Sequence, residues 1–408
     1  MTSNHRKHLA VAAAVAALLA ANAATAVARP ASASASASSA APSTPPSTAP
    51  STAQRLRQDV AAIHALGISG VQARTVAPDG RQAVATSGTA DLRTGRPVSP
   101  DGYFRMASTA KTLVATVVLQ LEAEGRLSLD DPVGRWLPDV AWGTAHDPAR
   151  ITVRDLLRHT GGISDAGLPG YRTADEYDHQ RFLTYSSEEL VTRAMAQEPA
   201  TGWSYSNTGY VMLGMIIERA TGRPSHQEIE DRILRPLGLR QTRWTGASPT
   251  LPRPHARAYE FYGPGAEKDV TVQIPVSTEL SWVTTTQDEN TLFRALLSGR
   301  LLPARQLAAM KDGVDVSGNP QAAAMWPAGT RYGLGLVEIP LDCGGRKGSY
   351  WSHEGGDGGY ITLNGVTADG RRSAVVSMSE AHGDSLDHIV EQEKAAGALI
   401  EHALCAGD

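Results

Sequence analysis

Strand-forming segments lie near both ends of this 408-residue chain, and helix-forming segments lie between them. Residues 71–76 and 82–86 alternate around a Pro-Asp-Gly turn, which predicts a β-hairpin. Residues 360–366 and 373–379 flank Asp369-Gly370 and predict a second hairpin. Strands at the two ends with helices between them indicate an α/β (α+β) fold, in which a helical insertion interrupts a sheet lobe.

Several segments carry the signals of helices. The expected helices cover residues 52–66, 108–124, 152–161, 211–220 and 385–404. Gly67 and Gly125 directly follow two of them, and Gly222 stands two residues after the end of a third, as is common for residues that end helices. Thr152 and Asp155 have the spacing of an N-terminal cap.

The first 54 residues lack the side chains of a folded core. A cationic stretch at residues 5–8, an apolar run at 9–20 and Ala26-Val27-Ala28 predict a signal peptide over residues 1–28. Residues 29–54 are almost entirely Ala, Ser, Pro and Thr, which predicts a disordered linker. We therefore expect a secreted protein, either extracellular or associated with the cell wall. An uncleaved anchor helix is the alternative.

The remaining chain, residues 55–408, is long enough for two lobes. We expect a sheet lobe from residues 55–130 and 270–408, and a helical lobe from residues 131–269. The formal net charge of −4 and the absence of a basic block argue against a nucleic-acid partner. We expect a monomer that has no contact with the membrane once the signal peptide is removed.

The chain contains two cysteines, Cys343 and Cys405. In an exported protein these predict one disulfide, which would tie the region of residue 343 to the C-terminal helix. Two free buried thiols are the alternative. No Cys/His spacing resembles a zinc site, so we expect no metal and no other cofactor.

Ser108 and Lys111 lie three residues apart at the start of an expected helix, so their side chains share one face. The Ser108 N–H belongs to the unpaired donors of the first turn, where the helix dipole favours negative charge. Met106, Leu113 and Val114 should strip water from Lys111 and lower its pKa toward that of a useful base. The pair predicts a nucleophile with its base.

Tyr205-Ser206-Asn207 forms a second motif, expected on a loop that enters a helix. A phenol close to a lysine can relay protons between a nucleophile and a leaving group. The carboxamide of Asn207 can bind a substrate amide.

His353-Glu354-Gly355-Gly356 forms a third motif, which precedes an expected strand. The glycines allow a ligand backbone to approach closely. The Gly356 N–H can complete an oxyanion hole together with the N–H of Ser108.

His159-Thr160-Gly161-Gly162 superficially resembles the third motif. It closes an expected helix and precedes the tyrosine motif, so it stands in the wrong order for that role. We interpret it as a structural helix end with a packed histidine.

The three motifs in this order resemble the serine β-lactamase and penicillin-binding superfamily, specifically the class C-like branch of D-alanyl-D-alanine carboxypeptidases, peptidase family S12. The resemblance covers residues 55–408 and is densest in the blocks 104–111, 119–131, 151–161, 203–210 and 332–336. It implies a β-lactamase-related catalytic domain: an antiparallel sheet flanked by N- and C-terminal helices, with an inserted all-helical lobe and the active site between them.

The resemblance also implies roles for single residues. These are catalytic roles for Ser108, Lys111, Tyr205 and His353, and substrate-binding roles for Asn207, Glu354, Gly355 and Gly356. Ser108 would be acylated, Lys111 would act as its base, and Tyr205 would shuttle the proton. His353 would stand where other branches have a lysine. β-Lactams are expected to acylate the same serine.

Glu354 departs from the carboxypeptidase pattern, which usually meets the terminal carboxylate of the substrate with threonine hydroxyls and a nearby cation. A carboxylate ~6 Å from Glu354 would be repelled by about 3 kcal/mol at an effective dielectric of ~20. Pairing of Glu354 with Arg346 or Lys347 would remove this repulsion, and the sequence leaves that open.

Three functions are compatible with these residues. The first is a secreted D-Ala-D-Ala carboxypeptidase that acts on peptidoglycan stem peptides. The second is an esterase, D-aminopeptidase or D-amidase of the same fold, which acts on a small ester or peptide substrate. The third, from a different class, is a penicillin-binding or sensor module that is acylated but does not turn over.

Overall fold

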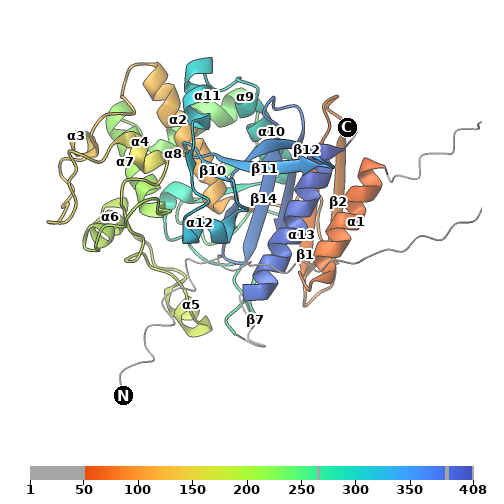
Figure 1. Cartoon of the computed structure of the whole chain (residues 1–408). Helices are drawn as coiled ribbons and strands as arrows, with labels where there is room; N and C mark the ends of the chain where they lie inside the picture. The colour runs from red at the N-terminus through yellow and green to blue at the C-terminus, as the bar shows by residue number, and fades with distance from the viewer. Residues whose placement is uncertain (1–50, 264–266, 382–385, 407–408) are drawn as a thin grey trace, which may run out of the picture.

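The computed structural model describes residues 51–263, 267–381 and 386–406 (Figure 1). The predicted signal peptide and most of the predicted linker lie outside these residues. Helix α1 (Thr52–Ala65) takes in the last three residues of that linker, because the Ser51 hydroxyl caps it by accepting from the Gln54 N–H. Across the described ranges, no helix combines the length and the apolar character that a membrane crossing requires.

Ten strands form an antiparallel sheet in the order β3-β2-β1-β15-β14-β12-β11-β10-β9, with β13 paired to β14. The strands are β1 (Gly70–Val76), β2 (Gln82–Asp91), β3 (Arg96–Pro97), β9 (Val314–Asp315), β10 (Arg331–Tyr332), β11 (Val337–Cys343), β12 (Arg346–Ser352), β13 (Gly355–Asp357), β14 (Tyr360–Val366) and β15 (Ser373–Met378). Both predicted hairpins are present, as β1–β2 and β14–β15. Strand β1 pairs directly with β15, so the two ends of the chain share one sheet, as predicted.

Helices cover both faces of this sheet. Helix α13 (Leu386–Cys405) packs beside α1 on one face (Figure 1). Ala374 and Val376 of β15 point to that side and join the core that α1 and α13 help to form. Ser373 points the other way, as strand alternation requires, and bonds Asn290 of α10 (Thr286–Leu297). The sheet is therefore flanked by the N- and C-terminal helices, as the family resemblance implied, and α10 covers its other face.

The inserted segment is mostly helical. Its helices are α3 (Val133–Trp136), α4 (Val153–Leu157), α5 (Ala174–Gln180), α6 (Ser187–Met195), α7 (Asn207–Thr221), α8 (Ser225–Ile229), η2 (Glu230–Leu234) and α9 (Arg235–Leu237). Thr152 and Asp155 form the predicted cap of α4, but this helix ends at Leu157 instead of residue 161. His159 has already left the helix, with a φ of 63°.

The prediction of an all-helical insertion needs one correction. The segment also contains β5 (Arg243–Trp244), β6 (Tyr259–Phe261) and β7 (Glu267–Asp269). These short strands form because the chain returns toward the sheet lobe, where β5 pairs with β8 and β6 pairs with β16. The remaining elements are β4 (Phe104–Arg105), η1 (Ala107–Thr109), α2 (Ala110–Ala123), η3 (Thr278–Leu280), β8 (Trp282–Thr284), α11 (Ala304–Lys311), α12 (Pro320–Met325) and β16 (Glu380–Ala381).

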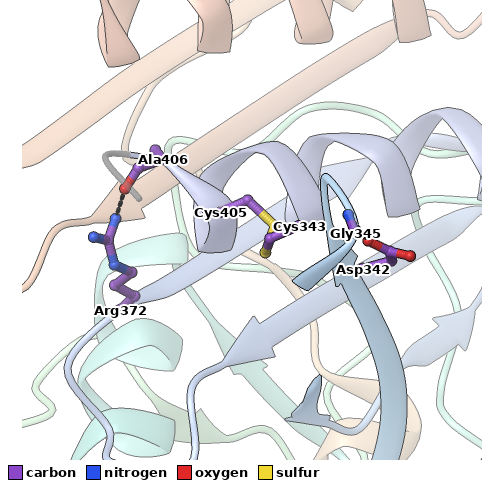
Figure 2. Close-up of a disulfide and its surroundings, with 6 residues drawn as sticks. All are labelled: Asp342, Cys343, Gly345, Arg372, Cys405 and Ala406. Carbon is purple, nitrogen blue, oxygen red and sulfur yellow. Dashed lines mark hydrogen bonds between the residues drawn. A yellow bond between two sulfur atoms is a disulfide. The ribbon is translucent and has the colours of Figure 1, made fainter. Parts of the chain in front are cut away.

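The predicted disulfide joins Cys343, at the end of β11, to Cys405, at the end of α13 (Figure 2). The bond closes a loop with a sequence separation of 62 residues. Nearby, the Arg372 guanidinium donates to the carbonyl oxygen of Ala406. The disulfide therefore links the C-terminal end of α13 to the β11–β12 hairpin, next to the turn between its strands.

We expect the double variant Cys343→Ala/Cys405→Ala to lose about 2–4 kcal/mol of unfolding free energy, because the unfolded chain regains the entropy of a long loop. Urea unfolding of the oxidised wild type and the variant measures this difference. Hydrolysis at the candidate site should persist in the folded variant. Equal stability of the wild type and the variant would show that the disulfide does not stabilise the fold.

Candidate active site

Ser108 lies where a strained turn enters a buried helix. The sequence predicted one helix from residue 108, but the segment begins with the 3₁₀ turn η1 and continues as α2. Ala107 has a φ of 49°, a conformation that costs a non-glycine residue about 1–3 kcal/mol. The surrounding packing must hold this turn in place. The turn places the Ser108 hydroxyl at the edge of the interior, where it is partly exposed.

The Lys111 amino group is fully buried beside this hydroxyl. Its Nζ lies 3.0 Å from Ser108 Oγ and donates to Asn207 Oδ1 at 2.6 Å. Burial lowers the pKa of Lys111 to about 7, although the negative charge of Asp165 opposes that effect. Lys111 is therefore poised to exchange a proton with Ser108 near neutral pH.

Tyr205 and Asn207 are brought to the same place by the start of α7. The Ser206 hydroxyl caps this helix by accepting from the Gly209 N–H, so Asn207 is its first residue. Lys111 Nζ lies 4.7 Å from the centroid of the Tyr205 ring. Burial raises the pKa of Tyr205 well above its usual value, and the adjacent Ser108 hydroxyl partly opposes this. The phenol therefore stays protonated at neutral pH and can donate a proton.

Asp165 organises the second motif, and sequence reasoning missed it. Its carboxylate accepts hydrogen bonds from the N–H groups of Asn207 and Thr208, at 2.6 and 3.0 Å, and from the Thr208 hydroxyl. A negative charge at the start of a helix is favourable, because the unpaired N–H groups point toward it. The residue lies in a loop after α4, outside every motif.

The third motif closes the site from the side of the sheet. The main chain of Gly355 in β13 packs so closely on η1 that a Cβ atom would lie 2.2 Å from the Met106 carbonyl oxygen. The Thr109 hydroxyl also donates to the His353 carbonyl oxygen at 3.1 Å. Gly356 is exposed, and a Cβ there would meet nothing closer than 4.0 Å. A ligand can therefore lie along β13 beside Ser108.

Glu354 takes a partner that the sequence did not suggest. The Trp326 indole N–H donates to its carboxylate. Arg346 and Lys347 lie at the opposite end of β12, about 20 Å and about 16 Å from Ser352 at ~3.3 Å per residue, so neither can neutralise Glu354. Burial raises the pKa of Glu354 to about 7, and the indole partly opposes this rise. Glu354 therefore becomes negatively charged as the pH rises above neutrality.

His353 is buried and belongs to a chain of hydrogen bonds rather than being a free cation at the surface. Its Nε2 lies 2.9 Å from the Tyr332 hydroxyl, which also lies 2.9 Å from His159 Nε2. Burial, followed by the charge of Lys111, lowers the pKa of His353 to about 3. The packing of His159 agrees with the sequence interpretation, but its link to His353 through Tyr332 was not foreseen.

Helix α12 and its flanking residues contact the second motif and Glu354, and the sequence did not predict this helix. The Gln321 side chain accepts from the Tyr205 N–H at 3.0 Å, and the Asn319 side chain donates to the Trp203 carbonyl oxygen at 2.7 Å. Trp326 follows the helix and contacts both Trp203 and Glu354. A six-residue helix without strong periodicity leaves little signal in a sequence.

Comparisons with known proteins show which family the chain is similar to. The sequence profile of the Beta-lactamase family matches residues 53–398. Penicillin-binding protein 4* of Bacillus subtilis is 27% identical over 345 residues, which cover 78% of this chain and 68% of that protein. Esterase EstB of Burkholderia gladioli is 36% identical over 171 residues, which cover 40% of this chain and 43% of EstB. The chain thus matches less than half the length of that esterase.

A crystal structure of a D-stereospecific amidohydrolase from Streptomyces sp. has the same fold, with a TM-score of 0.73 and 36% sequence identity. The match covers 83% of this chain and 97% of the other. The similarity thus extends over most of this chain and nearly all of the other.

We expect Asp165→Asn to move the acidic limb of the pH profile of kcat/KM to lower pH. The negative charge of Asp165 stabilises protonated Lys111, so its removal lowers the pKa of Lys111 further and keeps the amine neutral in more acidic solution. Hydrolysis of p-nitrophenyl acetate between about pH 5 and 9 measures the limb.

Asp155→Asn is the matched control, because it removes the charge of the capping carboxylate of α4, which accepts hydrogen bonds from Thr152 and Thr160 instead of from the second motif. Its acidic limb should coincide with that of the wild type. An upward shift in Asp165→Asn, or the same shift in both variants, would contradict the electrostatic link to Lys111.

Proposed function

Since the chain belongs to the Beta-lactamase family of serine hydrolases, we propose that it is a D-stereospecific amidohydrolase that forms an acyl-enzyme on Ser108. Its substrates in this proposal are amides, esters or short peptides of D-amino acids with a free α-ammonium group. The observation that carries the proposal is the half-buried carboxyl group of Glu354, which directly precedes strand β13. The similarity to the Streptomyces amidohydrolase supports it.

In the acylation step, neutral Lys111 accepts the Ser108 proton while Oγ bonds to the carbonyl carbon of the substrate. The N–H groups of Ser108 and Gly356 stabilise the resulting oxyanion. Tyr205 gives its proton to the leaving nitrogen as the C–N bond breaks, and it regains a proton from Lys111. Asn207 orients Lys111 through the bond to its Oδ1.

In the second step, water attacks the ester of Ser108. The same amine accepts a proton from the water, and the acid is released as the Ser108 hydroxyl is restored. Lys111 and Tyr205 thus return to their starting protonation states, and every proton and bond in the cycle is accounted for. The rate should rise with pH through about 7, because protonated Lys111 cannot act as a base.

The charged side chains near β13 favour a substrate that carries a positively charged group. Arg105 approaches Asp357 at the end of β13, but its Nη2 donates to the carbonyl oxygens of Thr271 and Gln273, so the fold already holds this guanidinium. His353 stays neutral at working pH because its pKa is about 3. Glu354 therefore attracts an ammonium group and repels a terminal carboxylate.

A D-Ala-D-Ala carboxypeptidase that is acylated by β-lactams is the second candidate, supported by the similarity to penicillin-binding protein 4*. In this role the enzyme must bind the free carboxylate of the substrate despite Glu354, which is possible where the carboxyl group of Glu354 is protonated. This candidate therefore predicts better binding below pH 7, the reverse of the amidohydrolase. In either case we propose a secreted protein, from the leader at residues 1–28.

We expect the purified enzyme to release ammonia from D-alaninamide, with little release from L-alaninamide and none in Ser108→Ala. D-Alanine release from diacetyl-Lys-D-Ala-D-Ala, measured in parallel, tests the carboxypeptidase. Hydrolysis of the tripeptide alone would move the assignment to that candidate, and hydrolysis of p-nitrophenyl acetate alone would move it to an esterase. Acylation by a β-lactam without any turnover would identify a binding module.

We expect Glu354→Gln to raise KM for D-alaninamide by up to about a hundredfold, which corresponds to the loss of about 3 kcal/mol of attraction at ~6 Å and an effective dielectric of ~20. The glutamine keeps an oxygen for the Trp326 indole. KM for the uncharged p-nitrophenyl acetate should stay the same. Glu338→Gln is the control, because it removes a carboxylate that bonds Ser349 and Arg331 on the neighbouring strands. Equal effects on both substrates would contradict an ionic role for Glu354.

A further inference from the structure

We infer that Tyr332 is a positioning residue of the active site, whose hydroxyl bridges two buried histidines and fixes each in one neutral tautomer. The bridge joins His159, which holds the second motif, to His353, which opens the third. This inference rests on the proposed serine chemistry only where it is tested through the rate of hydrolysis. The tautomers themselves can be observed independently of any substrate.

One end of the bridge sets the tautomer of His159. The Ser206 N–H can only donate, and it lies 3.1 Å from His159 Nδ1. This nitrogen must therefore carry a lone pair, and in a neutral ring the proton lies on Nε2. That Nε2–H then donates to the Tyr332 hydroxyl oxygen at 2.9 Å.

The other end of the bridge sets the tautomer of His353. The carbonyl oxygen of Glu354 can only accept, and it lies 2.9 Å from His353 Nδ1, which must therefore carry the proton. The His353 Nε2 then has a lone pair, and it accepts the O–H of Tyr332 at 2.9 Å. Tyr332 thus accepts one hydrogen bond and donates its own proton to the other ring.

The direction of every bond in this chain is fixed by the main-chain groups at its two ends. A second proton on His159 would face the Ser206 N–H, and a second proton on His353 would turn the Tyr332 O–H away from that ring, so either proton costs a hydrogen bond. Burial lowers the pKa of both histidines in the same direction, followed by the charge of Lys111. Both rings therefore remain neutral while Lys111 changes its charge.

The bridge is connected to the reacting groups at three points. The His159 ring lies 4.4 Å from the Tyr205 ring, measured between centroids. Ser206, held by His159, stands between Tyr205 and Asn207 in the chain. His353 accepts the Thr109 hydroxyl on its carbonyl oxygen, next to Ser108. Removal of the bridge should therefore loosen the phenol and β13 relative to the nucleophile.

Other polar groups surround the bridge and have partners of their own, and Tyr210 also shares a hydrogen bond with the Tyr332 hydroxyl. Lys111, on α2, bonds Ser108 and Asn207. Tyr210, on α7, donates to the Leu157 carbonyl oxygen at 2.8 Å. Tyr205 lies beside Ser108, and the Glu354 carboxylate accepts from Trp326. None of these recorded bonds supplies a proton to His353 Nε2, so Tyr332→Phe should leave that nitrogen without its donor.

The test compares Tyr332→Phe with Tyr177→Phe, which removes the hydroxyl of another buried tyrosine, on α5, that donates to a main-chain carbonyl oxygen, that of Val272, at 2.9 Å. Loss of the donor favours protonation of His353 and raises its pKa. We expect Tyr332→Phe to reduce kcat for p-nitrophenyl acetate about tenfold with little change in KM, and to steepen the acidic limb below about pH 6.5. Tyr177→Phe should keep the wild-type limb. Identical pH profiles in the two variants would overturn the inference.

A second measurement does not depend on activity or on the stability of a variant. Nitrogen NMR of ¹⁵N-histidine-labelled wild type, assigned with His159→Gln and His353→Gln, should show the Nε2–H tautomer at His159 and the Nδ1–H tautomer at His353 from about pH 5 to 9. Titration of either ring near 6.5, or the opposite tautomers, would overturn the inference. Hydrolysis that persists in Ser108→Ala would defeat the proposed function while leaving this observation valid.

Discussion

The burial of the Lys111 amino group is the constraint on which the rest of the site depends. A lysine held at a pKa of about 7 instead of 10.5 reflects about 5 kcal/mol by which the fold disfavours the charged form. Such a group survives in a core only where its hydrogen-bond partners are fixed, and here they are Ser108 and Asn207. The start of α2 and the start of α7 must therefore meet, although 96 residues of sequence separate Lys111 from Asn207.

The three motifs are assembled mainly through the main chain. Asp165 holds the first N–H groups of α7, the Gly355 main chain lies against the Met106 carbonyl, and the Thr109 hydroxyl bonds the His353 carbonyl. Contacts of this kind fix the position of a segment without specifying its side chains. They explain how a shared fold can keep a serine and a lysine in place while the residue at position 354, beside the groove, differs from the carboxypeptidase pattern.

The sequence predicted those features that leave a local or repeated pattern. Two hairpins, the Thr152–Asp155 cap and the terminal helices follow from alternation, turns and capping spacing, and the cysteine pair follows from its number. Asp165, Trp326 and Tyr332 could not be found in this way. Each is a single residue in a loop or a short strand, and its importance comes from a partner at least 21 residues away in the chain.

The charge at the start of β13 depends on His353 and Glu354, because desolvation affects the two side chains with opposite consequences. Burial keeps His353 neutral, so the position that other branches fill with a lysine offers no positive charge. Burial delays the ionisation of Glu354 but does not prevent it above about pH 7, where Lys111 also becomes neutral. The pH range in which the base is active is thus the range in which Glu354 is negative. Activity and attraction for a cationic substrate therefore rise together, whereas a substrate with a free carboxylate would meet growing repulsion as the base becomes competent.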